Sequence, residues 1–232
     1  MADRFYTPEP LTPGEFILTG QEAHHLATVR RFGRGDRVVL FNGDGNEYPA
    51  EIVAAGRRNV VLTVLSGEAV NRERPHALTI AAALPKGDRG EFLVEKLVEL
   101  GVSRFIPLRT ERTVVQPREA RLENLQRVVI EASKQCGRNV LMAIDPLTPW
   151  QTALGAADSA SRIVLHPDGA AMPSVGMDCT IGIGPEGGFT AGEIMAAVSA
   201  GWQRVSLGPR ILRVETAAIA AAALAASCRE IE

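Results

Sequence analysis

The sequence has few cysteines and no long apolar run. Cys136, Cys179 and Cys228 are odd in number and widely spaced, without a Cys-x-x-Cys pair. This pattern argues against a disulfide framework and against a zinc site, so no bound metal is expected. No stretch of about 18 apolar residues occurs, so a membrane span is not expected. The opening MADRFYTPEP has no hydrophobic signal region, which makes a reducing cytoplasm the expected location.

The chain also has little net charge and little lysine. The formal net charge of −2 does not by itself favour nucleic acid. Only Lys86, Lys96 and Lys134 are lysines, and the other 22 basic residues are arginines, which suit phosphate and base recognition. An arginine-rich, alanine-rich composition also follows from GC-rich coding, so clustering is the more informative feature. A near-neutral protein can bind RNA where its positive charge gathers on one face. The arginine clusters are Arg30, Arg31, Arg34 and Arg37, and then Arg109, Arg112, Arg118 and Arg121.

The first 70 residues indicate a small β-rich domain. Residues 42–46, NGDGN, are typical of a tight turn between two strands. The polar, proline-containing segment 67–76 predicts a linker, with a domain boundary near residue 73. We therefore expect one domain over 1–72 and a second over 73–232. The strands expected in the first domain cover 37–41, 48–53 and 59–65.

From His76 onward, apolar strand segments alternate with helical ones. This alternation predicts an α/β domain with a largely parallel sheet. Asp88 with Glu91, and Thr190 with Glu193, have the spacing of a helix N-terminal capping box. The expected strands are 77–84, 104–108, 162–166, 178–184 and 204–208, and the expected helices are 88–100, 118–136, 190–200 and 216–228.

Residues 182–187 match G-x-G-x-x-G, the pattern of a dinucleotide-binding loop. That loop normally follows the first strand of its fold and has an acidic residue about 20 positions later, and neither condition holds here. Glu186 would set a carboxylate against the pyrophosphate, at a cost of several kcal/mol in a partly buried site. Pro185 also removes a backbone donor. The pattern therefore does not predict a pyrophosphate site or a nucleotide-dependent oxidoreductase.

Three loops of similar kind follow three expected strands, at 165–169, 184–187 and 206–213. If the strands are neighbours, the loops converge on one ligand pocket. Plain surface turns are the alternative. A ligand that carries positive charge would tolerate Glu186 and Glu215 where a pyrophosphate would not.

The segments IGPEGGFT and LGPRILRVETA, over 183–190 and 207–217, closely resemble the ribosomal RNA small subunit methyltransferase E family. These enzymes belong to the SPOUT class of S-adenosylmethionine-dependent methyltransferases. The resemblance runs through essentially the whole chain in the expected order. Supporting segments are HHLATVRR, GDRVVLFNGDG, PKGDRGEFLVEKLVELGV, ERT and EASKQCGR.

The resemblance implies an N-terminal PUA-like β-barrel that binds RNA and a C-terminal domain with a parallel sheet tied in a trefoil knot. It implies a homodimer that methylates N3 of one uridine in 16S ribosomal RNA, near the decoding region. A SPOUT enzyme with another RNA target, or a non-catalytic RNA-binding or ribosome assembly factor, are the alternatives. The residues implied to bind S-adenosylmethionine are Leu165, His166, Gly184, Pro185, Glu186, Gly187, Leu207, Gly208, Ile211, Leu212, Arg213 and Thr216.

Methylation of uracil N3 requires loss of the N3 proton and stabilisation of charge on O2 and O4. Arg213 and Arg138 are candidate donors to those oxygens. Glu215 and Glu186 are candidate bases, although Glu215 also suits a helix N-terminus. His24 and His25 are expected to be structural. Candidate RNA contacts, with a plain solvated surface as the alternative, are Arg30, Arg31, Arg34, Lys86, Arg112 and Gln135.

Overall fold

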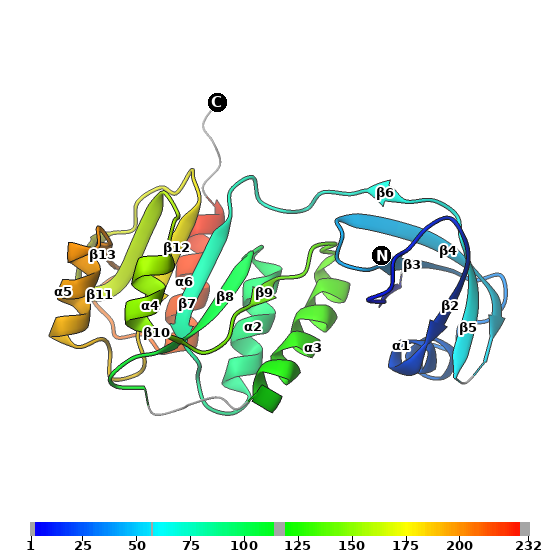
Figure 1. Cartoon of the computed structure of the whole chain (residues 1–232), viewed down its shortest axis with the longest axis horizontal. Helices are drawn as coiled ribbons and strands as arrows, with labels where there is room; N and C mark the ends of the chain where they lie inside the picture. The colour runs from blue at the N-terminus through cyan, green and yellow to red at the C-terminus, as the bar shows by residue number, and fades with distance from the viewer. Residues whose placement is uncertain (1–2, 57, 114–118, 228–232) are drawn as a thin grey trace. The chain divides into compact units, whose positions relative to one another are not determined.

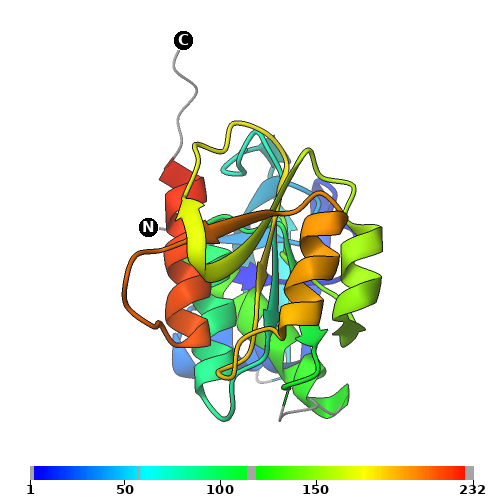
Figure 2. The same cartoon turned by 90° about the vertical axis from the view of Figure 1, so that its left-hand side faces the viewer.

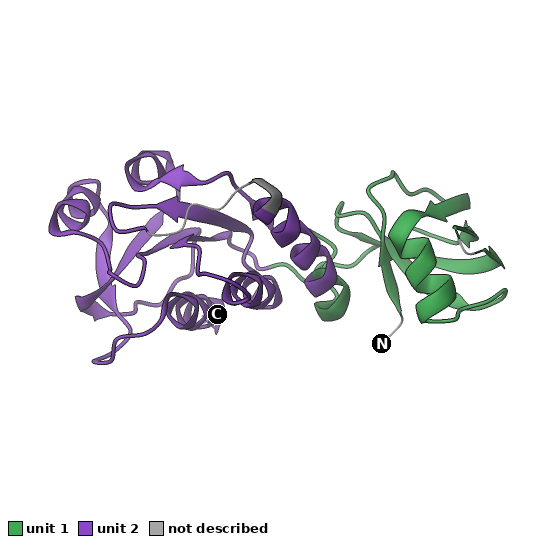
Figure 3. Cartoon of the chain, turned by 90° about the horizontal axis from the view of Figure 1, so that it is seen from below, with its two compact units in different colours: residues 1–73, 133–141 green, residues 74–132, 142–232 purple. Residues whose placement is uncertain are grey.

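The computed structural model describes residues 3–56, 58–113 and 119–227. The chain divides into two compact units, one made of residues 1–73 and 133–141 and the other of 74–132 and 142–232 (Figure 3). The boundary expected from the sequence lies near residue 73, and residues 133–141 belong to the first unit although no sequence signal placed them there. Arg118 and Cys228 lie outside the described residues. Within the described ranges, no helix is long and apolar enough to cross a membrane.

The first unit is an open, six-stranded sheet with the order β1-β3-β4-β5-β2, and β6 pairs with β4 (Figure 1). Because β1 and β2 lie at opposite ends of this path, the sheet is a half-barrel, which agrees with the PUA-like β-barrel that the resemblance implies. A short helix α1 and a π-helical turn η1 separate β2 from β3. The bounds are β1 Arg4–Tyr6, β2 Gly14–Thr19, α1 Gly20–His24, η1 His25–Val29, β3 Arg37–Phe41, β4 Asn46–Ala55, β5 Asn59–Val64 and β6 Glu68–Ala69.

The expected turn between β3 and β4 is present at NGDGN. Gly43 and Gly45 have φ angles of +94° and +96°, which glycine adopts without steric cost. The strands then alternate between solvent and core, with Leu40 and Ile52 almost fully buried against Leu26 of the π-helical turn. The turn chemistry and the alternation together hold the hairpin in register.

The second unit is a parallel seven-stranded sheet with the order β10-β8-β7-β12-β11-β13, and β9 pairs with β8. Helices α2 and α6 cover one face of the sheet, and α4 and α5 cover the other (Figure 2). This architecture confirms the predicted α/β class. The bounds are β7 Leu78–Ala83, α2 Arg89–Glu99, β8 Arg104–Arg109, α3 Glu119–Cys136, β9 Ala143–Ile144, β10 Thr148–Pro149, α4 Trp150–Ala156, β11 Ser161–Ala171, β12 Cys179–Ile183, α5 Ala191–Ser199, β13 Gln203–Ser206 and α6 Val214–Ser227.

One of the two predicted capping boxes is present. Thr190 and Glu193 each bond the backbone N–H of the other at the start of α5, as predicted. The prediction for Asp88 was wrong, because Asp88 is itself helical (φ −63°, ψ −18°) and its side chain makes no capping bond. Its intended partner Glu91 instead accepts a hydrogen bond from Nδ2 of Asn124 at 2.6 Å. A contact with another helix has therefore replaced the local one.

Candidate functional site

A pocket of about 330 Å³ lies at the carboxyl ends of β12, β11 and β13, which are neighbours in the sheet. All three loops singled out from the sequence line it, because their strands are neighbours in the sheet, as expected. Ligands of open parallel sheets bind at this edge. The lining residues are Arg112, Leu165, His166, Pro167, Ile183, Gly184, Pro185, Glu186, Gly187, Gly188, Phe189, Val205, Ser206, Leu207, Gly208, Arg210, Ile211, Leu212 and Ala217.

The loop after β12 is a tight turn that leads into α5. The N–H of Gly188 donates to the carbonyl of Pro185 at 2.7 Å, and Gly188 has a left-handed φ of +68°. A Cβ added at Gly184 would lie 2.9 Å from the backbone nitrogen of Phe189, so the turn accepts no side chain there. These constraints fix the backbone that lines the pocket.

The first glycine of the G-x-G-x-x-G pattern has a packing role. Gly182 lies within β12, and a Cβ added there would lie 2.7 Å from Cη2 of Trp150. Trp150 stacks on Phe189 with ring centroids 4.6 Å apart and meets Trp202 edge-on at 5.1 Å. The glycine therefore accommodates an aromatic cluster in the core, and its match to a phosphate-binding pattern is incidental.

The loop at 165–169 is a bulge inside β11, where the sequence analysis expected the strand to end at residue 166. The pairing of β11 with β13 shifts between Leu165 and Ala170. A Cβ added at Gly169 would lie within 2.6 Å of the backbone of Val205, so only glycine allows this approach of the strands. The bulge places Leu165, His166 and Pro167 along the pocket. Nδ1 of His166 accepts a hydrogen bond from the N–H of Asp168 at 3.2 Å.

The loop between β13 and α6 forms the third wall. Gly208 has a φ of +106°, and its N–H donates to Oγ of Ser206 at 3.2 Å. Ile211 is 92% exposed although it lines the pocket, so an apolar side chain stands uncovered at the pocket mouth. Arg213 and Thr216, which flank the start of α6, are exposed and are not among the lining residues.

Arg112, which the sequence analysis assigned to RNA, lines this pocket. Its Nη1 donates to the carbonyl of Gly187 at 2.6 Å. The loop that carries it is anchored on the start of α5, because the N–H of Glu111 donates to Oε1 of Glu193 at 2.9 Å. Arg112 therefore joins the loop after β8 to the loop after β12 and closes one side of the pocket.

The two candidate bases share a cation that the sequence analysis did not single out. Nη1 of Arg89, the first residue of α2, lies 3.4 Å from Oε1 of Glu215, and its Nη2 lies 3.9 Å from Oε1 of Glu186. The Glu186 side chain is 57% exposed, whereas Glu215 is buried. Among the described residues, Oε2 of Glu215 has no hydrogen-bond partner. The only local signal for Arg89 was its position after Pro-Lys-Gly-Asp at a strand end.

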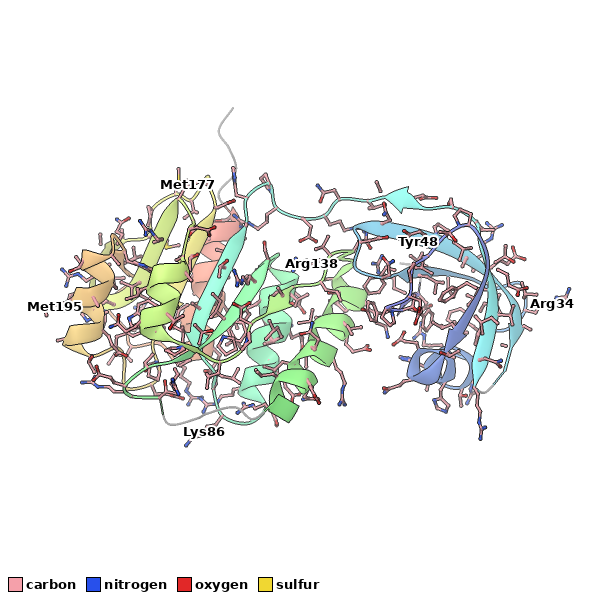
Figure 4. All side chains as sticks on the ribbon, in the orientation of Figure 1. Arg34, Tyr48, Lys86, Arg138, Met177 and Met195 are labelled. Carbon is pink, nitrogen blue, oxygen red and sulfur yellow. The ribbon has the colours of Figure 1, made fainter. Side chains whose placement is uncertain are left out.

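The remaining predicted site residues lie elsewhere. Arg138 is buried in the first unit, where it forms a salt bridge with Glu73. Arg30, Arg31 and Arg34 are exposed in the first unit, and Arg30 pairs with Asp3. Lys86 is exposed in the second unit, and the Lys86 and Arg34 side chains project from the ribbon (Figure 4). Gln135 is exposed near the end of α3. Across the part of the chain that the structure describes, no three His, Cys, Asp or Glu side chains are grouped as metal ligands would be.

The lining has the chemistry of a site for a small charged ligand. Its volume falls in the usual range of roughly 300–1,000 Å³ for small-molecule pockets. Leu165, Ile183 and Leu212 offer apolar surface, while Glu186 and Arg112 supply one negative and one positive charge. The arrangement suits a ligand with a flat or apolar body, a cationic centre and a carboxylate.

Each of the two units matches a known protein family. The family of the RNA methyltransferase domain matches residues 72–226, and that of the RNA methyltransferase PUA domain matches residues 18–65. A ribosomal RNA small subunit methyltransferase E from Synechocystis is 35% identical over 222 residues, which cover 90% of this chain and 72% of that protein.

Two solved structures are similar over nearly the whole chain. A Legionella pneumophila protein, determined in complex with bound S-adenosylmethionine, has 33% identity and a TM-score of 0.91, with 97% of each chain covered. A ribosomal RNA small subunit methyltransferase E from Neisseria gonorrhoeae, bound to S-adenosylmethionine, has 31% identity and a TM-score of 0.89, with 96% of each chain covered. The half-barrel sheet and the parallel sheet with its helices are therefore a fold shared with these proteins.

Proposed function

The chain belongs to the ribosomal RNA small subunit methyltransferase E family of SPOUT RNA methyltransferases, and we propose that it methylates N3 of a specific uridine in 16S ribosomal RNA near the decoding region. The observation that carries this proposal is the pocket at the ends of β12, β11 and β13. Solved relatives with the same fold hold S-adenosylmethionine. The first unit then binds the RNA and the second carries the reaction, in a reducing cytoplasm where ribosomes are assembled.

The residues of the pocket fit S-adenosylmethionine. The backbone of the loops at 165–167, 184–187 and 207–212, together with the apolar side chains of Leu165, Ile183 and Leu212, would hold the adenosine portion. Glu186 would supply negative charge for the cationic centres, and Arg112 would supply positive charge for the carboxylate. Arg213 and Thr216 extend the site from the start of α6. When bound, this cofactor supplies an electrophilic methyl group on a sulfonium.

The chain must remove the proton from uracil N3 and stabilise the resulting charge. We assign proton removal to Glu186, because it lines the pocket and its side chain is 57% exposed. A positioned general base contributes roughly 10²–10⁴-fold to the rate. Arg30, Arg31, Arg34, Lys86 and Gln135 remain predicted RNA contacts. Arg138 remains a predicted donor, although the contacts described above give it a structural partner in Glu73.

We also propose that the active form is a homodimer. The second unit exposes several large apolar side chains, among them Ile211 at 92% and Leu224 at 46%. A second copy that covers Ile211 would shield the pocket mouth from water. Sedimentation of the wild-type chain should give a dimer, and Ile211→Asp should shift it toward monomer.

Product mapping tests the activity. Small ribosomal subunits from cells that lack the gene are incubated with the protein and methyl-labelled S-adenosylmethionine, with naked 16S RNA and transfer RNA run alongside. We expect label in 3-methyluridine of 16S RNA. Label in another nucleoside would keep the methyltransferase and reject the target, and RNA binding without any label would indicate an assembly factor.

A further inference from the structure

The guanidinium of Arg89 is held between two carboxylates at the edge of the pocket. Its Nη1 faces Oε1 of Glu215 at 3.4 Å and its Nη2 faces Oε1 of Glu186 at 3.9 Å. Glu215 is only 7% exposed, so the first partner is fixed by packing. The Arg89 side chain is 40% exposed, so it stays accessible to a large substrate. A guanidinium has five N–H donors, and these two contacts leave donors for a third acceptor.

The backbone that carries Arg89 is also held. Nη2 of Arg121, on α3, donates to the carbonyls of Pro85 at 2.5 Å and Gly87 at 3.2 Å. Gly87 has a φ of +60°, and a Cβ added at Gly90 would lie 2.9 Å from Nη2 of Arg121. The start of α2 therefore fits closely around the Arg121 side chain. Donors held in advance in this way stabilise developing charge without reorganisation during the reaction.

We propose that Arg89 is a catalytic residue whose guanidinium contacts the O2–N3–O4 edge of the target uracil, and that Glu215 is the residue that positions it. This inference rests on the proposed function. The N3 proton passes to Glu186, and the electron pair of N3 forms the bond to the methyl carbon. The bond from that carbon to sulfur breaks, and its electron pair stays on sulfur. Negative charge that spreads to O2 and O4 during proton loss is then met by the donors of Arg89.

The two arginines singled out from the sequence are less suited to this role. Arg138 is 4% exposed and its guanidinium bonds the carboxylate of Glu73. Arg213 is exposed, and no salt bridge holds it among the described residues. Arg89 alone of the three combines a 40% exposed side chain with two charged partners that restrict its position. Electrostatic stabilisation depends on both properties.

The first experiment measures kcat, KM for the small subunit and the dissociation constant of S-adenosylmethionine by calorimetry. The variants are Arg89→Gln, Arg89→Lys and Glu215→Gln. The matched control is Arg104→Gln, which breaks another arginine–carboxylate pair of the same unit, with Asp145 at 2.7 Å. We expect Arg89→Gln to lower kcat by about 10²–10³-fold with cofactor affinity unchanged. Lysine should restore part of the loss, because it keeps the charge but lacks the planar fork.

The second experiment tests whether Arg89 acts on charge. Small subunits are reconstituted with 16S transcripts that contain either uridine or 5-fluorouridine, whose N3 proton is more acidic. Loss of the N3 proton leaves less charge to stabilise on the fluorinated ring. If Arg89 stabilises that charge, the ratio of the wild-type rate to the Arg89→Gln rate falls when the fluorinated substrate is used. A residue that only supports the fold gives the same ratio with both substrates.

The third experiment tests the link between the two residues. When two groups act as one unit, the second substitution adds little to the first. Glu215→Gln added to Arg89→Gln should therefore leave kcat where Arg89→Gln alone put it. Independent losses that multiply would overturn the positioning role of Glu215.

The outcomes separate this inference from the proposed function. If the wild-type product is not 3-methyluridine, the proposed function has failed, and this inference fails with it. If wild type yields 3-methyluridine but the fluorinated substrate leaves the rate ratio unchanged, only the role of Arg89 is overturned. Circular dichroism melting of each variant identifies any that fails to fold. If Arg89→Gln does not fold, Arg89→Lys is compared with wild type in its place.

Discussion

Nη2 of Arg4 donates a hydrogen bond to Oδ1 of Asn139 at 2.5 Å, across 135 positions of the chain. The same nitrogen also donates to the carbonyl of Arg138 at 3.1 Å, and Nη1 forms an ion pair with Glu47. Arg4 is 8% exposed and Asn139 2%. These buried contacts attach the end of α3 and the residues after it to the N-terminal sheet. They explain why residues 133–141 belong to the first unit.

Asn139→Ala should destabilise the first unit. The substitution removes the acceptor for Arg4 and also the donor to the carbonyl of Val70, which Nδ2 of Asn139 contacts at 2.9 Å. Nη2 of Arg4 then keeps only its bond to the carbonyl of Arg138, and the carbonyl of Val70 loses its donor, so we expect a loss of about 1–3 kcal/mol in the free energy of unfolding. Urea denaturation measures it. Asn124→Ala, which removes an exposed hydrogen bond to Glu91, should change it by less than about 0.5 kcal/mol. Equal losses for the two variants would contradict the prediction.

Glu47 should make stability depend on pH. Burial by itself would raise the pKa of Glu47, but hydrogen bonds from Arg72 and Arg4 outweigh it and lower that pKa below the ordinary 4.5. A carboxyl whose pKa is lowered by folding stabilises the protein above its ordinary pKa, and the stabilisation is lost as pH falls through the folded value.

Unfolding of wild type and Glu47→Gln from neutral pH to about pH 3 checks this. Wild type should be the more stable protein at neutral pH, and the difference should shrink on the acid side of 4.5. Glu51→Gln is the matched control, because Glu51 is 46% exposed and its contact with Arg37 is 3.9 Å long. A difference that stays constant with pH would show that the Glu47 carboxylate has no such role.

Gly182→Ala should be destabilising although it adds a single methyl group. The new Cβ would lie 2.7 Å from Cη2 of Trp150, and overpacking of this kind costs about 1–3 kcal/mol. Gly155→Ala, in α4, has no atom within 4 Å of its added Cβ and should be neutral or stabilising by up to about 1 kcal/mol. Thermal melting compares the two. An unchanged melting temperature for Gly182→Ala would mean that Trp150 and its aromatic neighbours shift at little energetic cost.

Arg112→Ala should weaken cofactor binding more than RNA binding. The arginine lines the pocket and bonds the carbonyl of Gly187 at 2.6 Å, so its loss removes both a charge and a support for the loop. Loss of one charge-assisted contact of about 1.5–3 kcal/mol corresponds to a rise in Kd of roughly 10–100-fold. Calorimetry with S-adenosylmethionine measures it, and Arg127→Ala, exposed on α3, is the control. Unchanged cofactor affinity with a raised KM for RNA would show that Arg112 contacts RNA, as the sequence predicts.

Several elements were predictable because their signals are local. The apolar runs that became β7, β8 and β12 and the capping box of Thr190 and Glu193 depend on neighbouring residues alone. Helix α4 was missed, because its stabilising contacts are distant. Its Trp150 packs on Phe189 and Trp202, and its Nε1 donates to the carbonyl of Glu193 at 3.2 Å.

The candidate site shows the same division. Glu186 and Glu215 were recognised as chemically unusual in their loops, and the three loops were expected to converge. Arg89 was missed, because it meets Glu215 across 126 positions and no sequence spacing signals that contact. Arg112 was assigned to RNA from its place in an arginine cluster, and the anchoring of its loop on Glu193 brought it to the pocket.

The sequence alone therefore determined the α/β class of the second unit, the β-rich character of the first 70 residues, and the loops able to approach a ligand. These features follow from strand, helix and turn preferences that arise within a few residues. Tertiary structure decided the strand order that gathers those loops and the membership of residues 133–141 in the first unit. It also decided that Gly182 serves tryptophan packing and that Arg89 lies between two carboxylates. These features depend on contacts between residues far apart in the chain, whose energies exist only once the whole chain has folded.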